Sequence, residues 1–268
     1  MSETVLLVGC GNMGRAMLAG WRRGRPDMKV WVVEPADALR DAAADLGASV
    51  AARREALPDD IAPDLVFLAV KPQVMGDVAP LYADLAAGAF VSIAAGTTTA
   101  SLKSWLGRAA PIIRCMPNTP AAIAAGMLVC APTVEVAEPA RMLANDLLAA
   151  SGEVAWIDDD GLMDAVTAVS GSGPAYVFHF IEALADAAVK AGLPAELAAK
   201  MALQTVMGAG RLAAESGIPP GVLREQVTSP GGTTAAGLSV LRDTGRLSEL
   251  LAETVEAARA RGEELGKA

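Results

Sequence analysis

The sequence predicts an α/β N-terminal domain, built on a doubly wound and mainly parallel sheet, followed by an all-α C-terminal domain. Three observations carry this prediction. Strand-like and helix-like segments alternate up to about residue 158, only helix-like segments follow, and a glycine-rich turn joins the first strand to the first helix. Strands that alternate with helices indicate a parallel sheet with both faces covered. We therefore expect domains at 1–158 and 159–268.

The first domain consists of short apolar runs separated by helix-like stretches. Runs rich in Val, Ile and Leu are typical of buried strands. We expect strands at 4–8, 29–33, 65–70, 89–93, 112–115, 127–130 and 153–157. We expect helices between them at 12–23, 36–46, 102–106 and 135–149.

The second domain is expected to contain helices alone. Their ranges are 162–169, 175–191, 194–215, 222–227, 234–242 and 247–265, with glycines at their ends. Ala and Gly recur at close spacing in 183–214, which lets helices approach closely. Helices that are apolar on more than one face need a further partner. We therefore expect a homodimer built through the C-terminal helices, which makes this a dimerisation domain.

Composition excludes several classes of protein. The net charge of −9 leaves no basic footprint for nucleic acid. The longest uncharged run, 115–134, is interrupted by three prolines, so we expect no membrane span and no signal peptide. Cys10, Cys115 and Cys130 lack any CxxC spacing, which argues against a disulfide framework or a metal site. These features favour a cytoplasmic protein that acts on a small molecule.

A dinucleotide-binding motif follows the first expected strand. Gly9, Gly11 and Gly14 form G-x-G-x-x-G, with Asn12 and Met13 inside it, and the motif opens a helix. In this context the first glycine permits a tight turn, the second lets the backbone approach a pyrophosphate, and the third lets helix and strand pack closely. The helix N-terminus supplies N–H groups to the phosphates. The first domain is therefore expected to be a Rossmann domain.

The adenosine end of the cofactor is expected beside Glu34, which follows the second strand. A carboxylate here accepts a hydrogen bond from the ribose 2′-hydroxyl and repels a 2′-phosphate, which favours NADH. Arg53 and Arg54 follow the next short strand and offer guanidinium groups to a 2′-phosphate. A solvated surface is the alternative for this arginine pair. We expect NADH to be preferred and NADPH to be accepted.

Further loops follow strands at the same edge of the sheet, where ligands of open α/β sheets bind. They are candidate walls for the cofactor and the substrate. The cofactor candidates in these loops are Ala69, Val70, Lys71, Pro72, Ile93, Ala94 and Ala95. Asn118 lies between Pro117 and Pro120, which fix the backbone, and is a candidate substrate ligand.

No general acid is evident in the sequence. The sole histidine, His179, stands among aromatic residues in a helical pattern, which favours a core or interface role. Lys71, at the end of a strand, is a candidate acid, but a lysine in that place is often only an ion-pair partner. Reduction of a ketone calls for a proton donor at oxygen, whereas an iminium nitrogen is already protonated when hydride arrives. The pattern therefore favours an imine substrate.

One loop interrupts the helices of the second domain. Pro230, Gly231 and Gly232 are poor helix formers, and Ser229, Thr233 and Thr234 flank them with hydroxyls. Two adjacent glycines permit a concave run of N–H donors that binds an anion, and a helix beginning near Thr234 adds its dipole. A helix-breaking turn without a ligand is the alternative.

Six strings together resemble the pyrroline-5-carboxylate reductases, in that family's order and over nearly the whole chain. They are GCGNMG (9–14), AVKP (69–72), SIAAG (92–96), RCMPNTP (114–120), SGSGPAY (170–176) and TSPGGTT (228–234). The resemblance implies NAD(P)H-dependent reduction of L-1-pyrroline-5-carboxylate to L-proline, the last step of proline biosynthesis. It implies interlocked homodimers that often assemble further, commonly to a decamer.

The resemblance also implies roles for particular residues. The loop Ser229–Thr234 is expected to hold the substrate carboxylate, with the catalytic Thr234 hydroxyl facing the ring nitrogen. Many family members carry a small hydroxyl or amide residue in place of Glu34 and Asn in place of Arg53. Both departures bear on the choice between NADH and NADPH.

Two other functions are consistent with parts of the sequence. A β-hydroxyacid dehydrogenase pairs the same two kinds of domain and depends on a lysine of the helical domain. Lys190 and Lys200 are available for that role, although their flanking residues do not match. A non-catalytic NAD(P)-sensing protein is the second alternative, and such a protein needs no anion-binding loop for a substrate.

Overall fold

The computed structural model describes residues 3–267, without the side chains of Thr244 and Lys267. Its centre is an eight-stranded sheet in the order β3-β2-β1-β4-β5-β6-β7-β8. The strands are β1 (Thr4–Val8), β2 (Lys29–Val33), β3 (Ser49–Ala51), β4 (Leu65–Leu68), β5 (Ala89–Ser92), β6 (Ile112–Met116), β7 (Gly126–Pro132) and β8 (Gly152–Trp156). All neighbouring strands pair in parallel except β6 and β7. The first six strands have the doubly wound order of a dinucleotide-binding domain, which confirms the predicted fold class.

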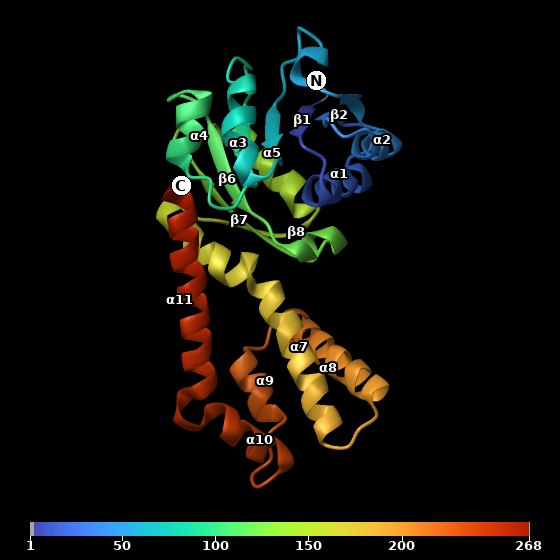
Figure 1. Ribbon diagram of the computed structural model, residues 1–268, viewed down its shortest axis with the longest axis vertical. Helices are drawn as coiled ribbons and strands as arrows, with labels where there is room; N and C mark the ends of the chain where they lie inside the picture. Colours follow the sequence, from blue (N-terminus) through green and yellow to red (C-terminus); the bar gives the residue numbers. More distant parts are fainter. Residues whose placement is uncertain (1–2, 268) are drawn as a thin grey trace. The chain divides into compact units, whose positions relative to one another are not determined.

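Helices cover both faces of this sheet (Figure 1). They are α1 (Asn12–Gly24), α2 (Asp37–Asp45), α3 (Pro72–Val78), α4 (Thr99–Leu106) and α5 (Glu138–Ala149), with short 3₁₀ turns η1 (Arg54–Ala56), η2 (Ala79–Tyr82) and η3 (Thr119–Ile123). One core cluster joins the sheet to α1, α2 and α5, and includes Trp21 and Leu147. The second joins the opposite face to α3, η2 and α4, and includes Tyr82 and Leu102. Burial on both faces explains why the central strands are apolar throughout.

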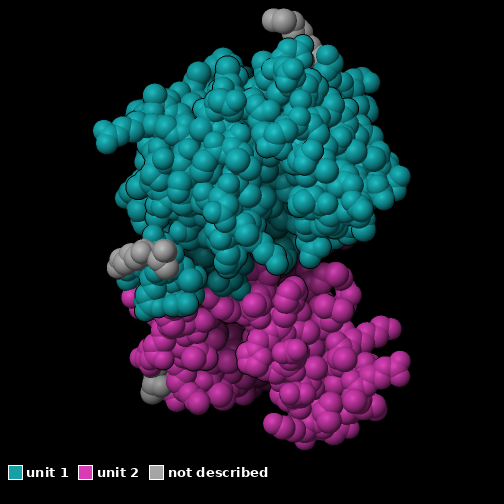
Figure 2. Space-filling model, turned by 45° about the horizontal axis from the view of Figure 1, so that its top comes forward, with its two compact units in different colours: residues 1–172, 258–268 teal, residues 173–257 magenta. Residues whose placement is uncertain are grey.

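The chain divides into two compact units, residues 1–172 with 258–268 and residues 173–257, coloured teal and magenta in Figure 2. This division differs from the expected domains, 1–158 and 159–268. The segment after β8 contains η4 (Asp160–Leu162), α6 (Met163–Val166) and the π-helical turn η5 (Thr167–Gly171). It stays with the first unit because Arg114 on β6 pairs with Asp160 at 2.7 Å.

The second unit is helical, as expected. It contains α7 (Gly173–Lys190), α8 (Ala195–Ser216), α9 (Pro220–Gln226), α10 (Thr233–Arg242), η6 (Asp243–Gly245) and the first half of α11 (Arg246–Lys267). Large apolar side chains of α7 and α8 are exposed, among them Phe178, Phe180, Leu203 and Met207. None of the described helices is long and apolar enough to cross a membrane.

An ion pair in the first unit makes the folding stability of the protein depend on pH in the acidic range. Lys103 Nζ on α4 lies 2.8 Å from Glu135 Oε1, before α5. Hydrogen bonds, the largest contribution coming from Lys103, followed by Thr133 and the backbone, lower the pKa of Glu135 to about 2. The unfolded chain, with an ordinary glutamate pKa of about 4.3, then binds more protons between these two values. This contribution to stability is present above the unfolded pKa and is lost as pH falls through the folded pKa.

We expect the melting temperature of the native protein to fall more steeply than that of Glu135→Gln between about pH 5 and about pH 2. Thermal unfolding followed by circular dichroism at several pH values measures both slopes. Parallel slopes for the two proteins would show that this ion pair does not contribute.

Candidate active site

The glycine-rich turn joins β1 to α1. Gly9 N donates to Val33 O at 2.8 Å, and Gly9 has a φ of 89°, which favours glycine. A Cβ on Gly14 would lie 2.6 Å from Gly9 O, so close packing of α1 on the turn requires glycine there. A Cβ on Gly11, the N-cap of α1, would meet no described atom within 4 Å. Space is therefore open above Gly11, which fits a bound pyrophosphate.

The carboxylate of Glu34 ties the end of β2 to this turn. Its Oε2 accepts from Cys10 N at 2.8 Å, and its Oε1 accepts from Ala36 N at 3.0 Å. The residue is buried, yet each carboxylate oxygen keeps a lone pair for a further donor. Burial, followed by the charge of Glu34, raises the pKa of Cys10. Cys10 is therefore a protonated structural thiol rather than a nucleophile.

A groove of about 520 Å³ lies over this edge of the sheet. Seven of the expected cofactor residues line it, namely Gly9, Gly11, Glu34, Arg53, Ala69, Val70 and Lys71. Arg54 and Tyr82 also line it. Tyr82 was not predicted, because a lone tyrosine outside any motif carries no sequence signal. Burial raises the pKa of Tyr82 to about 12, so its hydroxyl stays protonated and is available as a hydrogen-bond group.

The two arginines of the groove differ in their surroundings. The Arg53 side chain is 79% exposed and lies 3.9 Å from Glu55. The Arg54 side chain is 19% exposed and reaches Asp84 at 3.5 Å, while its Nε is buried without a hydrogen-bond partner among the described residues. Both guanidinium groups thus already face a carboxylate, which weakens their attraction for a phosphate.

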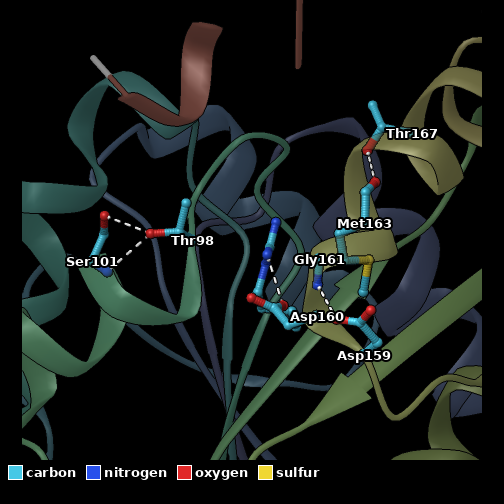
Figure 3. A network of polar contacts seen from close by, with 8 residues as sticks. Thr98, Ser101, Asp159, Asp160, Gly161, Met163 and Thr167 are labelled. Carbon is cyan, nitrogen blue, oxygen red and sulfur yellow. Dashed lines mark hydrogen bonds and ion pairs between the residues drawn. The ribbon is translucent and has the colours of Figure 1, made fainter. Parts of the chain in front are cut away.

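The remaining expected cofactor residues do not line this groove. Asn12 and Met13 open α1 and line a neighbouring surface groove with Thr119. Pro72 is the first residue of α3, and Ile93 N donates to Leu68 O at 3.2 Å. Ala94 and Ala95 follow β5 and line a small cavity with Arg114, Met116 and Met163. Figure 3 shows the nearby turn, where Thr98 caps α4 through Ser101.

Asn118, an expected substrate ligand, has both ends of its amide bound to backbone. Its Oδ1 accepts from Met127 N at 2.9 Å, and its Nδ2 donates to Ser170 O at 3.0 Å. Proline neighbours and an extended backbone present the side chain in this position. No motif in the sequence pairs Asn118 with Ser170, which lies 52 residues away.

The expected anion-binding loop lies in the second unit, where Gly231 has a φ of 69°. Gly232 N donates to Ser229 O at 3.0 Å, which closes a turn and engages that N–H within the loop. The α10 helix begins at Thr233, and its first helical bond runs from Ala236 N to Gly232 O. The N–H groups of Thr233–Ala235 therefore lack intrahelical acceptors and are available to an anion.

Other candidate groups take no evident part in a site. His179 is exposed on α7 and lies 3.4 Å from Glu182, so it is outside the core of the single chain. Across the described residues, no group of three or more His, Cys, Asp or Glu is arranged to hold a metal ion. The first unit thus has a groove at its glycine-rich turn, and the second has a helix N-terminus where hydroxyls lie beside N–H groups without intrahelical acceptors.

Comparisons with known proteins agree with these features. Residues 160–265 match the family described as pyrroline-5-carboxylate reductase dimerisation, and residues 4–96 match NADP oxidoreductase coenzyme F420-dependent. The pyrroline-5-carboxylate reductase of Pseudomonas aeruginosa is 38% identical over 98% of this chain and 97% of its own.

Solved structures extend this similarity to the fold. The chain is similar to a pyrroline-5-carboxylate reductase from Coxiella burnetii, with a TM-score of 0.93, 34% identity and full coverage of both chains. The Plasmodium falciparum pyrroline carboxylate reductase with NADP bound has a TM-score of 0.81 and 29% identity over 98% of each chain. With a dinucleotide site, a dimerisation region and relatives that span its length, this chain belongs to the pyrroline-5-carboxylate reductase family.

Proposed function

We propose that this chain reduces L-1-pyrroline-5-carboxylate to L-proline with NAD(P)H, the last step of proline biosynthesis, and that the loop Ser229–Thr234 holds the substrate. The observation that carries the proposal is the N-terminus of α10, where the N–H groups of Thr233–Ala235 lack intrahelical acceptors beside exposed hydroxyls. The substrate has one carboxylate and one cyclic imine. A helix N-terminus suits the first group, and a hydroxyl suits the second.

The cofactor site is supported by the residues of the first unit. The open space above Gly11 and the N-terminus of α1 fit a pyrophosphate, and Glu34 fits a ribose hydroxyl. Lys71 and Val70 line the same groove. When bound, the reduced nicotinamide supplies the hydride. The chain's own residues hold the cofactor in place and give the substrate its orientation.

Substrate binding rests on the loop before α10. The N–H groups of Thr233 and Thr234 donate to the carboxylate, and the Ser229 hydroxyl adds a third donor. Gly232 contributes its backbone shape, because its own N–H is engaged with Ser229 O. The Thr234 hydroxyl forms a hydrogen bond at the ring nitrogen. Since that nitrogen is protonated in the reactive iminium, the reaction needs no general acid and depends on orientation.

NADH is the proposed preferred cofactor, with NADPH also accepted. We expect Glu34→Gln to lower kcat/KM for NADH. The ratio of kcat/KM for NADH to kcat/KM for NADPH should fall by about tenfold, which is the scale of a hydrogen bond to a charged group. The amide keeps one acceptor oxygen but removes the charge that repels a 2′-phosphate. Initial rates with each cofactor measure the ratio. A native enzyme that strongly prefers NADPH would exclude the proposal about Glu34.

Homo-oligomers form through the C-terminal region, and we propose a homodimer in which the exposed apolar side chains of α7 and α8 are covered by the partner. A further assembly of dimers into a decamer is part of the same proposal. Sedimentation velocity measures the state. A cytoplasmic location is proposed from the three unpaired, buried cysteines.

One assay tests the proposed function directly. Loss of absorbance from NADH and from NADPH is followed separately with pyrroline-5-carboxylate, and proline is tested as a product inhibitor. Saturable oxidation of either cofactor with formation of proline supports the proposal. Binding of NADH without any turnover would favour the non-catalytic alternative.

A further inference from the structure

The chain leaves its first compact unit through a π-helical turn. The turn η5 spans Thr167–Gly171, and the division between units falls directly after Ser172. Ser172 N donates to Thr167 O at 2.8 Å. This hydrogen bond reaches back five residues, where an α-helical hydrogen bond reaches back four. Single π-helical turns are rare and occur often at functional sites. This turn is therefore a specific feature of the joint between the units.

Side-chain hydrogen bonds support the bend at this turn. Thr167 Oγ1 donates to Met163 O at 2.8 Å, as Figure 3 shows, and Ser170 Oγ donates to Val166 O at 3.1 Å. Such bonds to the carbonyl four residues earlier bend helices. One carbonyl of the turn, Ser170 O, accepts a hydrogen bond from Asn118 Nδ2 outside the segment.

Three residues at and just after the end of β6, at every second position, contact the segment from η4 to η5. Arg114, whose side chain is 11% exposed, pairs with Asp160 at the start of the segment. Met116 lies against Gly171, where an added Cβ would come within 2.4 Å of Met116 Cε. Asn118, in extended backbone after the strand, holds Ser170 O. Alternate residues of an extended segment point to the same side, so one strip of side chains anchors both ends of the segment.

We propose that Asn118 is a positioning residue of the reaction, which fixes the π-helical joint rather than binding the substrate. One amide joins three segments, since its oxygen holds Met127 N at the start of β7 and its nitrogen holds Ser170 O. The chain continues from this anchored turn into the unit that carries Ser229–Thr234. The inference rests on the proposed function, because it takes that loop to hold the substrate.

The test is Asn118→Asp, which keeps the acceptor for Met127 N and replaces the donor facing Ser170 O with a carboxylate oxygen. We expect kcat/KM for pyrroline-5-carboxylate to fall by about ten- to a hundredfold, the scale of a misplaced substrate group. We expect the Kd for NADH to stay within about twofold, because the groove over the glycine turn is not altered. Backbone amide exchange at Ser172 and in the first turn of α7 should rise by about tenfold.

Asn145→Asp is the matched control. Asn145 is also a half-buried asparagine of the first unit, and it accepts from Trp156 Nε1 through an oxygen that aspartate retains. This variant should keep native kinetics and native exchange at Ser172. Asn118→Ala removes both hydrogen bonds, and Asn118→Asp remains the deciding variant if Asn118→Ala fails to fold.

Unchanged exchange at Ser172 in Asn118→Asp would overturn the proposal, whatever the activity. A raised KM with unchanged exchange would instead assign Asn118 as a direct substrate ligand. Failure of the native protein to reduce pyrroline-5-carboxylate would refute the proposed function alone, because amide exchange reports on the joint without any substrate.

Discussion

Replacing Thr234 with alanine is expected to lower kcat/KM for pyrroline-5-carboxylate by about 5- to 150-fold, which corresponds to roughly 1–3 kcal/mol of transition-state binding. The side chain is exposed at the second position of α10, so its loss leaves no cavity in the folded chain. The expected effect therefore comes from the lost hydrogen bond at the ring nitrogen. Steady-state kinetics at saturating NADH measure it.

Two variants make this result specific. Thr234→Ser retains the hydroxyl and should keep most of the activity. Thr254→Ala removes a hydroxyl that bonds to Leu250 O within α11, and it should leave the kinetics unchanged. A folded Thr234→Ala protein with native kcat/KM would remove Thr234 from the mechanism. A loss shared equally by Thr254→Ala would point to general destabilisation.

Much of the candidate cofactor groove was predictable because it is local in sequence. Gly9, Gly11 and Gly14 lie within six residues, and the strand and helix around them follow from apolar patterning. Glu34 was placed by its distance from this motif at the end of the second strand. Parallel strands bring their carboxyl ends to one edge, so the loops after β1, β2 and β4 meet without further information.

The parts that could not be predicted depend on contacts between distant residues. To predict the hydrogen bond between Asn118 and Ser170, one must know where the end of β6 lies relative to the turn η5. No residue pattern in the sequence indicates that this turn is π-helical. The end of α11 belongs to the first unit because Gly262 fits against Asp164, where an added Cβ would lie 2.9 Å from Oδ1. A glycine in a helix indicates that another segment packs closely against it, but does not indicate which segment that is. The sequence pattern therefore does not indicate that the end of α11 belongs to the first compact unit.

Replacing Gly11 with alanine is expected to weaken NADH binding by about ten- to a hundredfold without lowering the stability of the free protein. An added Cβ meets no described atom, and Gly11 has a φ of −65°, which alanine adopts readily. The methyl group would instead occupy the space that the pyrophosphate needs above the turn. Loss of a charge-assisted hydrogen bond to backbone costs about 1.5–3 kcal/mol, which sets the expected range.

Substitutions of two glycines within α1 serve as controls that distinguish an effect on NADH binding from an effect on folding stability. Gly24→Ala, at the far end of the helix, also meets no described atom and should change neither NADH affinity nor melting temperature. Gly14→Ala should destabilise the free protein by about 1–3 kcal/mol, because its Cβ would meet Gly9 O at 2.6 Å. Calorimetric titration with NADH and thermal unfolding without it measure the two quantities. Native affinity in Gly11→Ala would mean that the cofactor does not pass over this turn, whereas lost affinity at unchanged stability locates the pyrophosphate at Gly11.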